Sequence, residues 1–191
     1  MKICFLCDRN SQDFCGINLQ KTVLELLTAS EHEITTIVLV GDEISPCLGC
    51  FKCWITTPGL CVLTADEINS MARQVINSDV LLLLSQINYG GYSYDIKAFL
   101  DRFIPNILPF FEIVEAETHH KKRYKKYPTM LSIGYGASSQ QENSTFHKLV
   151  QRNALNFRAP HFGVLSLNAD TEAQTAISTF LYSNIKKVEL T

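Results

Sequence analysis

The chain has 191 residues, of which 46% are hydrophobic and 19% are charged, and its formal net charge is −2. These values are ordinary for a folded protein with a sizeable core, and the length predicts a single domain over residues 1–191. The charge gives no general attraction to nucleic acid or to an anionic membrane, and no run of 18 apolar residues predicts a membrane span.

Segments that read as strands and helices alternate along the chain. Short apolar or β-branched runs are typical of strands, whereas apolar residues at intervals of three and four indicate amphipathic helices. Capping-box signatures at 64–67 and 139–142 mark the starts of two helices. In chain order we predict a strand at 3–7, a helix at 17–27, a strand at 34–40, a helix at 68–76, a strand at 80–84, a helix at 92–103, a strand at 130–133 that begins near 127, a helix after 139 that reaches 154, a strand at 162–167 and a helix at 173–185.

The alternation predicts an α/β fold. Five strands that each lead into a helix form a parallel sheet with helices on both faces, which is a three-layer sandwich. The doubly wound strand order 2-1-3-4-5 suits this number of strands. It places a ligand crevice above the carboxyl ends of strands 1, 3 and 4.

Residues 105–128 interrupt the alternation, and we expect them to form an irregular insertion. Insertions of this length inside a compact domain are usually functional or interfacial. The first part, 107–114, is apolar and favours a homo-oligomer, because an exposed apolar patch calls for a partner. The basic part, 119–126, fits either recognition of a nicotinamide phosphate or a solvated loop.

Four of the seven cysteines follow a C-x2-C-x2-C-x7-C pattern. The amino-terminal segment is too short for a signal peptide, so we expect a cytoplasmic protein whose cysteines are thiols or metal ligands. Four thiolates suit a [4Fe–4S] cluster or a structural zinc ion, and free thiols are the alternative. The candidate metal ligands are Cys47, Cys50, Cys53 and Cys61.

The loop after the first strand is a candidate phosphate site. A phosphate needs N–H and hydroxyl donors at a helix amino terminus, with little negative charge nearby. Asp8 and Asp13 would repel a phosphate if they faced it, and a capped loop without a ligand is the alternative. The candidate donors are Arg9, Asn10, Ser11, Gly16 and Asn18.

The loops after strands 3 and 4 are candidates for binding a flat ring. Gly90 and Gly91 allow the backbone to approach a ring closely, and Tyr89 and Tyr92 offer stacking faces. Without further support, an ordinary glycine turn before a helix is the alternative. The candidate ring-binding residues are Gln86, Ile87, Asn88, Tyr89, Gly90, Gly91, Tyr92, Tyr135 and Gly136.

Three features of the sequence resemble one known family. They are the cysteine loop at 47–61, the segment 85–93 with the Lys-x3-Asp-Arg motif at 97–102, and the order of elements along the whole chain. Together they resemble the flavodoxin-like NADPH-dependent FMN reductase superfamily, and within it the branch of iron–sulfur flavoproteins. Two positions depart from that pattern: the first loop reads Cys-Asp-Arg instead of Gly-Ser-x-Arg, and Gln86 stands where proline is usual.

The resemblance implies a flavodoxin-like redox protein that binds FMN. NAD(P)H would be the electron donor, the acceptor is unknown, and a [4Fe–4S] cluster would make the protein an electron carrier. The resemblance also implies a homodimer or higher oligomer. No side chain is assigned as a catalytic acid or base, since the cofactor carries the chemistry. The alternative is a flavodoxin-like scaffold that has lost FMN and serves in interaction or metal binding.

Overall fold

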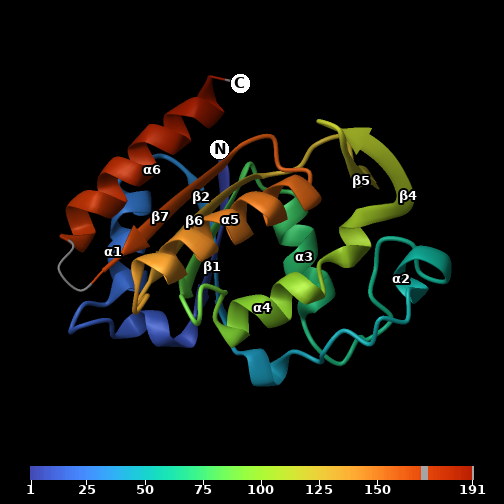
Figure 1. Ribbon diagram of the computed structural model, residues 1–191, viewed down its shortest axis with the longest axis horizontal. Helices are drawn as coiled ribbons and strands as arrows, with labels where there is room; N and C mark the ends of the chain where they lie inside the picture. The colour runs from blue at the N-terminus through green and yellow to red at the C-terminus, as the bar shows by residue number, and fades with distance from the viewer. Residues whose placement is uncertain (169–171, 191) are drawn as a thin grey trace.

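The main sheet contains five parallel strands in the order β2-β1-β3-β6-β7 (Figure 1). The computed structural model describes residues 1–168 and 172–190. The order matches the predicted 2-1-3-4-5 arrangement, because β4 and β5 form a separate sheet. Strand β3 lies at the centre and is buried along almost its whole length, as expected of a continuous apolar run in a parallel sheet. The strands are β1 (Lys2–Asp8), β2 (Glu33–Leu39), β3 (Val80–Gln86), β6 (Thr129–Tyr135) and β7 (Phe162–Leu167).

Helices cover both faces of this sheet and bury one apolar stripe each (Figure 1). One face is covered by α3, α4 and α5, and the other by α1 and α6. The three-layer prediction therefore agrees with the structure. No helix in the described part of the chain is long and apolar enough to cross a membrane. The helices are α1 (Leu19–Thr28), α2 (Lys52–Ile55), α3 (Ile68–Ile76), α4 (Tyr94–Asp101), α5 (Gln140–Asn156) and α6 (Ala173–Glu189).

Residues 105–128 are not irregular, as we had expected from the sequence, but contain a β-hairpin. Strand β4 (Ile107–Val114) pairs antiparallel with β5 (Glu117–Lys122), apart from the main sheet. Glu115 and Ala116 connect them with φ angles of 50° and 65°. Such a two-residue turn normally carries Asn-Gly or Asp-Gly, so the sequence contains no hairpin signal at this point.

The two predicted capping boxes differ in outcome. At the start of α5, the side chain of Ser139 accepts a hydrogen bond from the N–H of Glu142 at 3.2 Å, as predicted. At the start of α3 no capping side chain is bonded, and the cap position is Glu67. The neighbouring Asp66 instead accepts from the N–H of Ile68 and forms an ion pair with a distant arginine. Asp66 therefore bonds the first N–H of α3 and also pairs with a distant arginine.

Candidate functional site

The carboxyl ends of β1, β3 and β6 meet at one edge of the sheet, and a buried aspartate lies between them. One oxygen of Asp8 accepts the backbone N–H of Gln86 at 2.6 Å, and the other accepts the hydroxyl of Tyr135 at 2.5 Å. Burial raises the pKa of Asp8, while these hydrogen bonds act in the opposite direction. The floor of the predicted crevice is therefore filled by a side chain of the protein itself.

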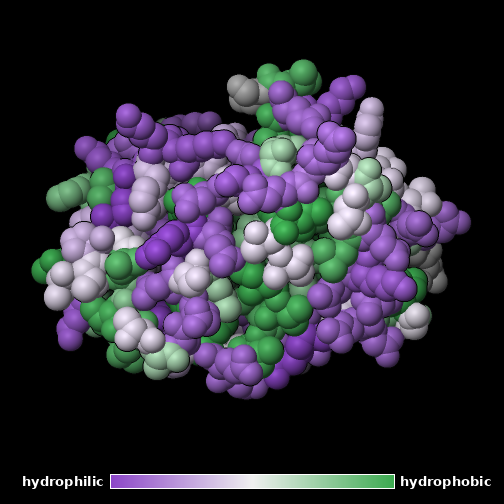
Figure 2. Space-filling model, turned by 180° about the vertical axis from the view of Figure 1, so that it is seen from behind, coloured by the Kyte–Doolittle hydropathy of each residue, from purple (hydrophilic) through white to green (hydrophobic). Residues whose placement is uncertain are grey.

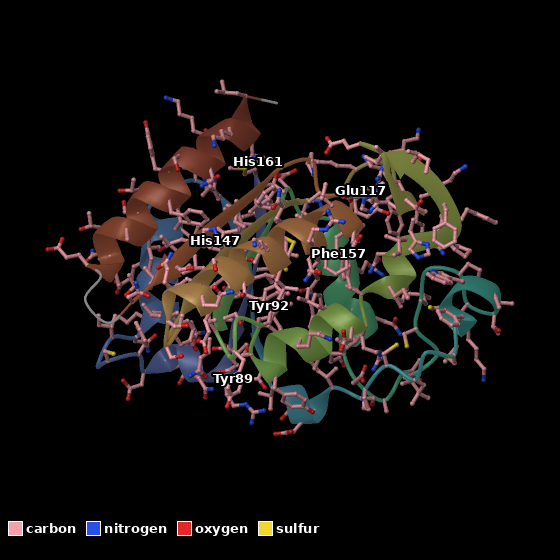
Figure 3. The ribbon with its side chains drawn as sticks, in the orientation of Figure 1. Tyr89, Tyr92, Glu117, His147, Phe157 and His161 are labelled. Atoms are coloured by element: carbon pink, nitrogen blue, oxygen red, sulfur yellow. The ribbon has the colours of Figure 1, made fainter. Side chains whose placement is uncertain are left out.

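A strained two-residue turn follows β3 at this edge. The backbones of Asn88 and Gly91 exchange two hydrogen bonds of 3.0 and 2.8 Å across it. Tyr89 and Gly90 both have positive φ, 52° and 79°. A Cβ added to Gly90 would lie 2.7 Å from the Cβ of Thr145, so α5 packs closely on the turn. The turn is therefore held in place, and it presents the Tyr89 side chain to solvent with 95% exposure (Figure 3).

Three of the predicted ring-binding side chains belong to the core instead. Ile87, Tyr92 and Tyr135 are buried. The Tyr92 ring packs edge-on against Phe146 at 5.3 Å between centroids, and Figure 3 shows it inside the molecule, away from Tyr89. Helix α4 begins two residues later than predicted, so Tyr92 precedes it and turns inward. Stacking by Tyr92 on an exposed ligand is thus ruled out by its packing.

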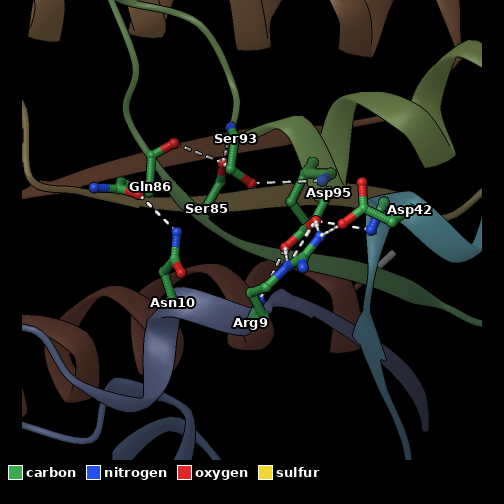
Figure 4. Close-up of polar contacts among 9 residues, drawn as sticks. Arg9, Asn10, Asp42, Ser85, Gln86, Ser93 and Asp95 are labelled. Atoms are coloured by element: carbon green, nitrogen blue, oxygen red, sulfur yellow. Dashed lines mark hydrogen bonds and ion pairs between the residues drawn. The ribbon is translucent and has the colours of Figure 1, made fainter.

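Gln86 and Gly136 are two further predicted ring-binding residues at this edge of the sheet. Gly136 has a φ of 78°, and a Cβ added there would lie 3.7 Å from the side chain of Gln86. The amide of Gln86 is in turn bonded to the loop after β1, through Asn10 at 3.0 Å (Figure 4). The structure therefore brings the three predicted loops together at one place.

The predicted phosphate donors lie in this edge region, and each has a partner within the protein. The loop begins as a short 3-10 helix, η1 (Arg9–Gln12), rather than as an open anion-binding turn. Several of its donors are consequently bonded to the protein's own groups. The Ser11 hydroxyl donates to the Asp8 carbonyl at 2.6 Å, the Gly16 N–H to Asp13 at 3.1 Å and the Asn10 amide to Gln86 at 3.0 Å, while the Asn18 side chain accepts the N–H of Lys21 at 2.8 Å.

Arg9 is held by two carboxylates (Figure 4). Its Nε lies 3.0 and 3.2 Å from the two oxygens of Asp95, and its Nη2 lies 2.8 Å from Asp95 and 3.0 Å from Asp42. Burial would raise the pKa of Asp95, but hydrogen bonds from Arg9 and from the N–H of Gly41 lower it. Neither aspartate was a predicted site residue. Asp95 occupies the first turn of α4, where an acidic residue is normally explained by the helix dipole.

The four cysteines of the 47–61 loop line a single small apolar hollow of about 30 Å³. Cys47 and Cys50 are exposed, whereas Cys53 is buried. Burial raises the pKa of Cys53, and the nearby thiols Cys61, Cys47 and Cys50 raise it further. Within the described ranges, no group of three or more potential ligands is already arranged around a metal position. The sulfurs are therefore neighbours without being a preformed ligand set.

Arg102 forms part of the wall of this hollow. Its Nη1 and Nη2 bind both oxygens of Asp66 and the carbonyls of Ser45 and Leu63. Its Nε is buried without a hydrogen-bond partner. An unpaired buried donor is costly, so this N–H is suited to a hydrogen bond with a bound group. Arg102 is the last residue of the Lys-x3-Asp-Arg motif. The sequence analysis did not predict that this arginine lies beside the cysteines.

A pair of hydrogen bonds fixes the backbone of Cys61. The side chain of Asn69, on α3, accepts the N–H of Cys61 at 2.8 Å and donates to its carbonyl at 2.9 Å. The fourth cysteine of the pattern is thus fixed to a helix, while the first two lie on an exposed segment. The loop therefore has one side bonded to a helix and one side exposed to solvent.

Sequence comparison finds partial relatives. No family model matches the chain. An iron–sulfur flavoprotein from Methanocaldococcus jannaschii is 28% identical over 87 residues, which are 46% of this chain and 44% of that protein. Another, from Archaeoglobus fulgidus, is 30% identical over 82 residues, which are 43% of this chain and 36% of that protein. The chain thus spans less than half the length of these curated relatives.

Structural comparison covers nearly the whole chain. NAD(P)H:quinone oxidoreductase from Methanothermobacter marburgensis superposes with a TM-score of 0.67 and 10% identity, over 99% of this chain and 97% of that one. The fold is flavodoxin-like. Oxidised flavodoxin 1 from Bacillus cereus also matches, with a TM-score of 0.56 and 10% identity over 97% and 98% of the two chains. The resemblance that the sequence predicts is confirmed, although identities this low establish the fold alone.

Proposed function

We propose that the chain is a flavin-dependent redox protein that takes electrons from NAD(P)H, as an oxidoreductase or as an electron-transfer flavoprotein. The observation that carries this proposal is the Tyr89–Gly90 turn at the carboxyl edge of β3. In open α/β sheets, ligands bind at this edge, where the strand order reverses. The partial sequence similarity to two iron–sulfur flavoproteins supports the same function.

The Tyr89 side chain has the features of a ligand contact. A tyrosine in the left-handed region is strained, and such strain is typical of functional sites. The ring is 95% exposed, so packing within this chain does not explain the residue. A flat aromatic ligand would cover the ring and gain stacking energy.

The residues at the edge fit one part of FMN and not the other. The exposed Tyr89 ring, the amide of Gln86 and the backbone at Gly136 suit the isoalloxazine ring. Four of the predicted phosphate donors, Arg9, Asn10, Ser11 and Gly16, already donate to groups of the protein, so a phosphate would have to displace these bonds. A bound flavin would supply the redox chemistry, while the chain would position and shield the ring.

Flavin binding tests this function. We expect the purified chain to quench the fluorescence of added riboflavin or FMN, and Tyr89→Ala to weaken the affinity by at least about tenfold. Tyr182→Ala is the matched control, since Tyr182 is 70% exposed on α6. A folded chain that binds neither flavin would refute the proposal and favour the scaffold that has lost its cofactor.

We further propose that the cysteine hollow holds a [4Fe–4S] cluster. Four cysteines around one apolar space support this, and Arg102, whose Nε is buried without a hydrogen-bond partner, also lines the space. A space of 30 Å³ has the volume of about one water molecule, so the exposed Cys47–Cys50 segment must move outward to admit a cluster. A bound cluster would transfer single electrons.

Anaerobic reconstitution with iron and sulfide tests the cluster. We expect about four iron and four sulfide per chain, with broad absorbance near 400 nm that bleaches on reduction. Cys53→Ser should abolish this, whereas Cys15→Ser, at an exposed cysteine outside the loop, should not. Tetrahedral zinc binding would support the structural alternative, and four freely alkylated thiols would support neither metal.

We also propose a homo-oligomer that uses the hairpin. Phe110, Phe111 and Ile113 of β4 are each more than 60% exposed. Figure 2 shows a separate group of hydrophobic side chains near the middle of the face opposite to the view of Figure 1, away from the side on which the hairpin lies. Light scattering on the wild type and on Ile113→Lys tests this proposal. The wild-type particle should have a mass greater than that of one chain, and the mass of the variant particle should be lower.

A further inference from the structure

The loop after β1 has an excess of acidic groups around its arginine. Asp42 and Asp95 both bind the guanidinium of Arg9, so carboxylates outnumber the cation. Asp8, directly before Arg9, adds a third carboxyl group that is completely buried. A site for a phosphate dianion has the opposite balance, with cations and free N–H groups that face the ligand.

Arg9 cannot use its Nε–Nη2 edge for a phosphate without giving up its present partners. Its Nε and Nη2 are bonded to Asp95, and these are donors that a bidentate phosphate contact requires. Movement of Arg9 would leave the Asp95 carboxylate, which is 5% exposed, without its cation. Asp95 cannot follow the arginine easily, because it also accepts the N–H of Gly41 at 2.7 Å.

Three other predicted donors of this loop are already bonded within the protein. The Ser11 hydroxyl is buried and donates to the backbone carbonyl of Asp8. The Asn10 amide donates to Gln86, and the N–H of Gly16 donates to Asp13. A phosphate at this place would have to break several of these bonds while it approaches two carboxylates.

The residues of this edge that would contact a ring carry no charge, unlike the loop after β1. Tyr89 is exposed on a turn that α5 holds in place, and Gln86 is a neutral amide. These groups recognise an uncharged flat ring, and nothing in them depends on a phosphate. The carboxylates at Arg9 would therefore repel the phosphate of FMN, whereas the contacts at Tyr89 and Gln86 would act on the flavin ring.

We propose that the edge formed by the carboxyl ends of β1, β3 and β6 binds a flavin without a terminal phosphate, riboflavin in preference to FMN, and that the Arg9–Asp95–Asp42 cluster discriminates against the phosphate. The inference rests on the proposed function, because it requires a flavin ring against Tyr89. Riboflavin and FMN share this ring and the ribityl chain, so the difference in their affinities isolates the effect of the phosphate.

Parallel fluorescence titrations of the full chain with riboflavin and FMN at low ionic strength test the proposal. Riboflavin should bind at least about tenfold more tightly than FMN. Raising the salt concentration to about 0.5 M should narrow the difference, because salt screens the repulsion. FMN that binds as tightly as riboflavin, or more tightly, would overturn the discrimination and leave the flavin function standing. A folded chain that binds neither would overturn both.

A charge variant gives a second readout. Asp42 is 70% exposed, so Asp42→Asn should fold normally while it removes one of the two carboxylates at Arg9. The ratio of the two dissociation constants should shift toward FMN by about threefold or more. Asp101→Asn, which removes another exposed ion-paired carboxylate, is the matched control and should leave the ratio unchanged. An unchanged ratio in Asp42→Asn would contradict the assigned role of the cluster.

Discussion

Arg102 and Asp66 form an ion pair that is almost wholly removed from solvent, with side chains 1% and 4% exposed. The Nη1 and Nη2 atoms of Arg102 lie 2.9 and 3.2 Å from the two carboxylate oxygens. The pair connects the end of α4 to the segment before α3, and Arg102 also binds the carbonyls of Ser45 and Leu63. It therefore fixes both ends of the cysteine loop.

Loss of Arg102 should destabilise the whole chain. Arg102→Met leaves Asp66 buried without a partner, so we expect the free energy of unfolding to fall by about 3–5 kcal/mol. Denaturation in urea measures this change. Arg73→Met, at an exposed arginine on α3, is the control and should change little. A stability equal to the wild type in Arg102→Met would show that the ion pair is not structurally important.

The ionised carboxylate of Asp95 should increase the free energy of unfolding near neutral pH and lose this effect in acid. Burial opposes ionisation of Asp95, but Arg9 and the N–H of Gly41 outweigh it, so the folded pKa is below the unfolded value. Ionised Asp95 therefore stabilises the fold above about pH 4, and this contribution is lost as the pH falls through the folded pKa. Urea unfolding at several pH values should show a smaller acid loss in Asp95→Asn than in the wild type. Parallel pH profiles would contradict the assignment.

Tyr89→Asn should change stability and ligand binding in opposite directions. Asparagine adopts positive φ more easily than tyrosine, and Asn-Gly is the preferred pair for a two-residue turn. We expect a gain of about 0.5–1 kcal/mol in the free energy of unfolding. The stacking ring is lost, so flavin affinity should decrease. Thermal unfolding and fluorescence titration on the same sample check both effects. A variant that is stabilised yet binds flavin normally would exclude Tyr89 from the site.

The cysteines should fall into two groups in their reaction with iodoacetamide. Burial raises the pKa values of Cys4 and Cys7 to about 12, so these thiols should stay unmodified until the protein unfolds. Cys47 and Cys50 are exposed and should react first. Mass spectrometry of peptides after timed alkylation gives the order. Rapid modification of Cys4 or Cys7 in the folded chain would show that β1 opens readily.

Much of the fold could be read from local patterns. The continuous apolar run of β3 and the one-sided apolar spacing of the helices predicted the central strand and the layers, because periodicity reports burial directly. The hairpin at 107–122 could not be read, since Glu115 and Ala116 take positive φ without a residue that favours it. The capping box at 64–67 does not form because α3 begins only at Ile68, and Asp66 there pairs with Arg102, 36 residues away.

The sequence by itself determined that three loops converge at one sheet edge and that four cysteines lie close together, since strand order and short spacing follow from local signals. Only the tertiary structure decided what those loops do with their donors. Arg9 meets Asp95 across 86 residues, and Tyr92 turns into the core. Such pairings depend on which distant elements the topology brings into contact, and residue order does not encode charge partners that meet only after folding.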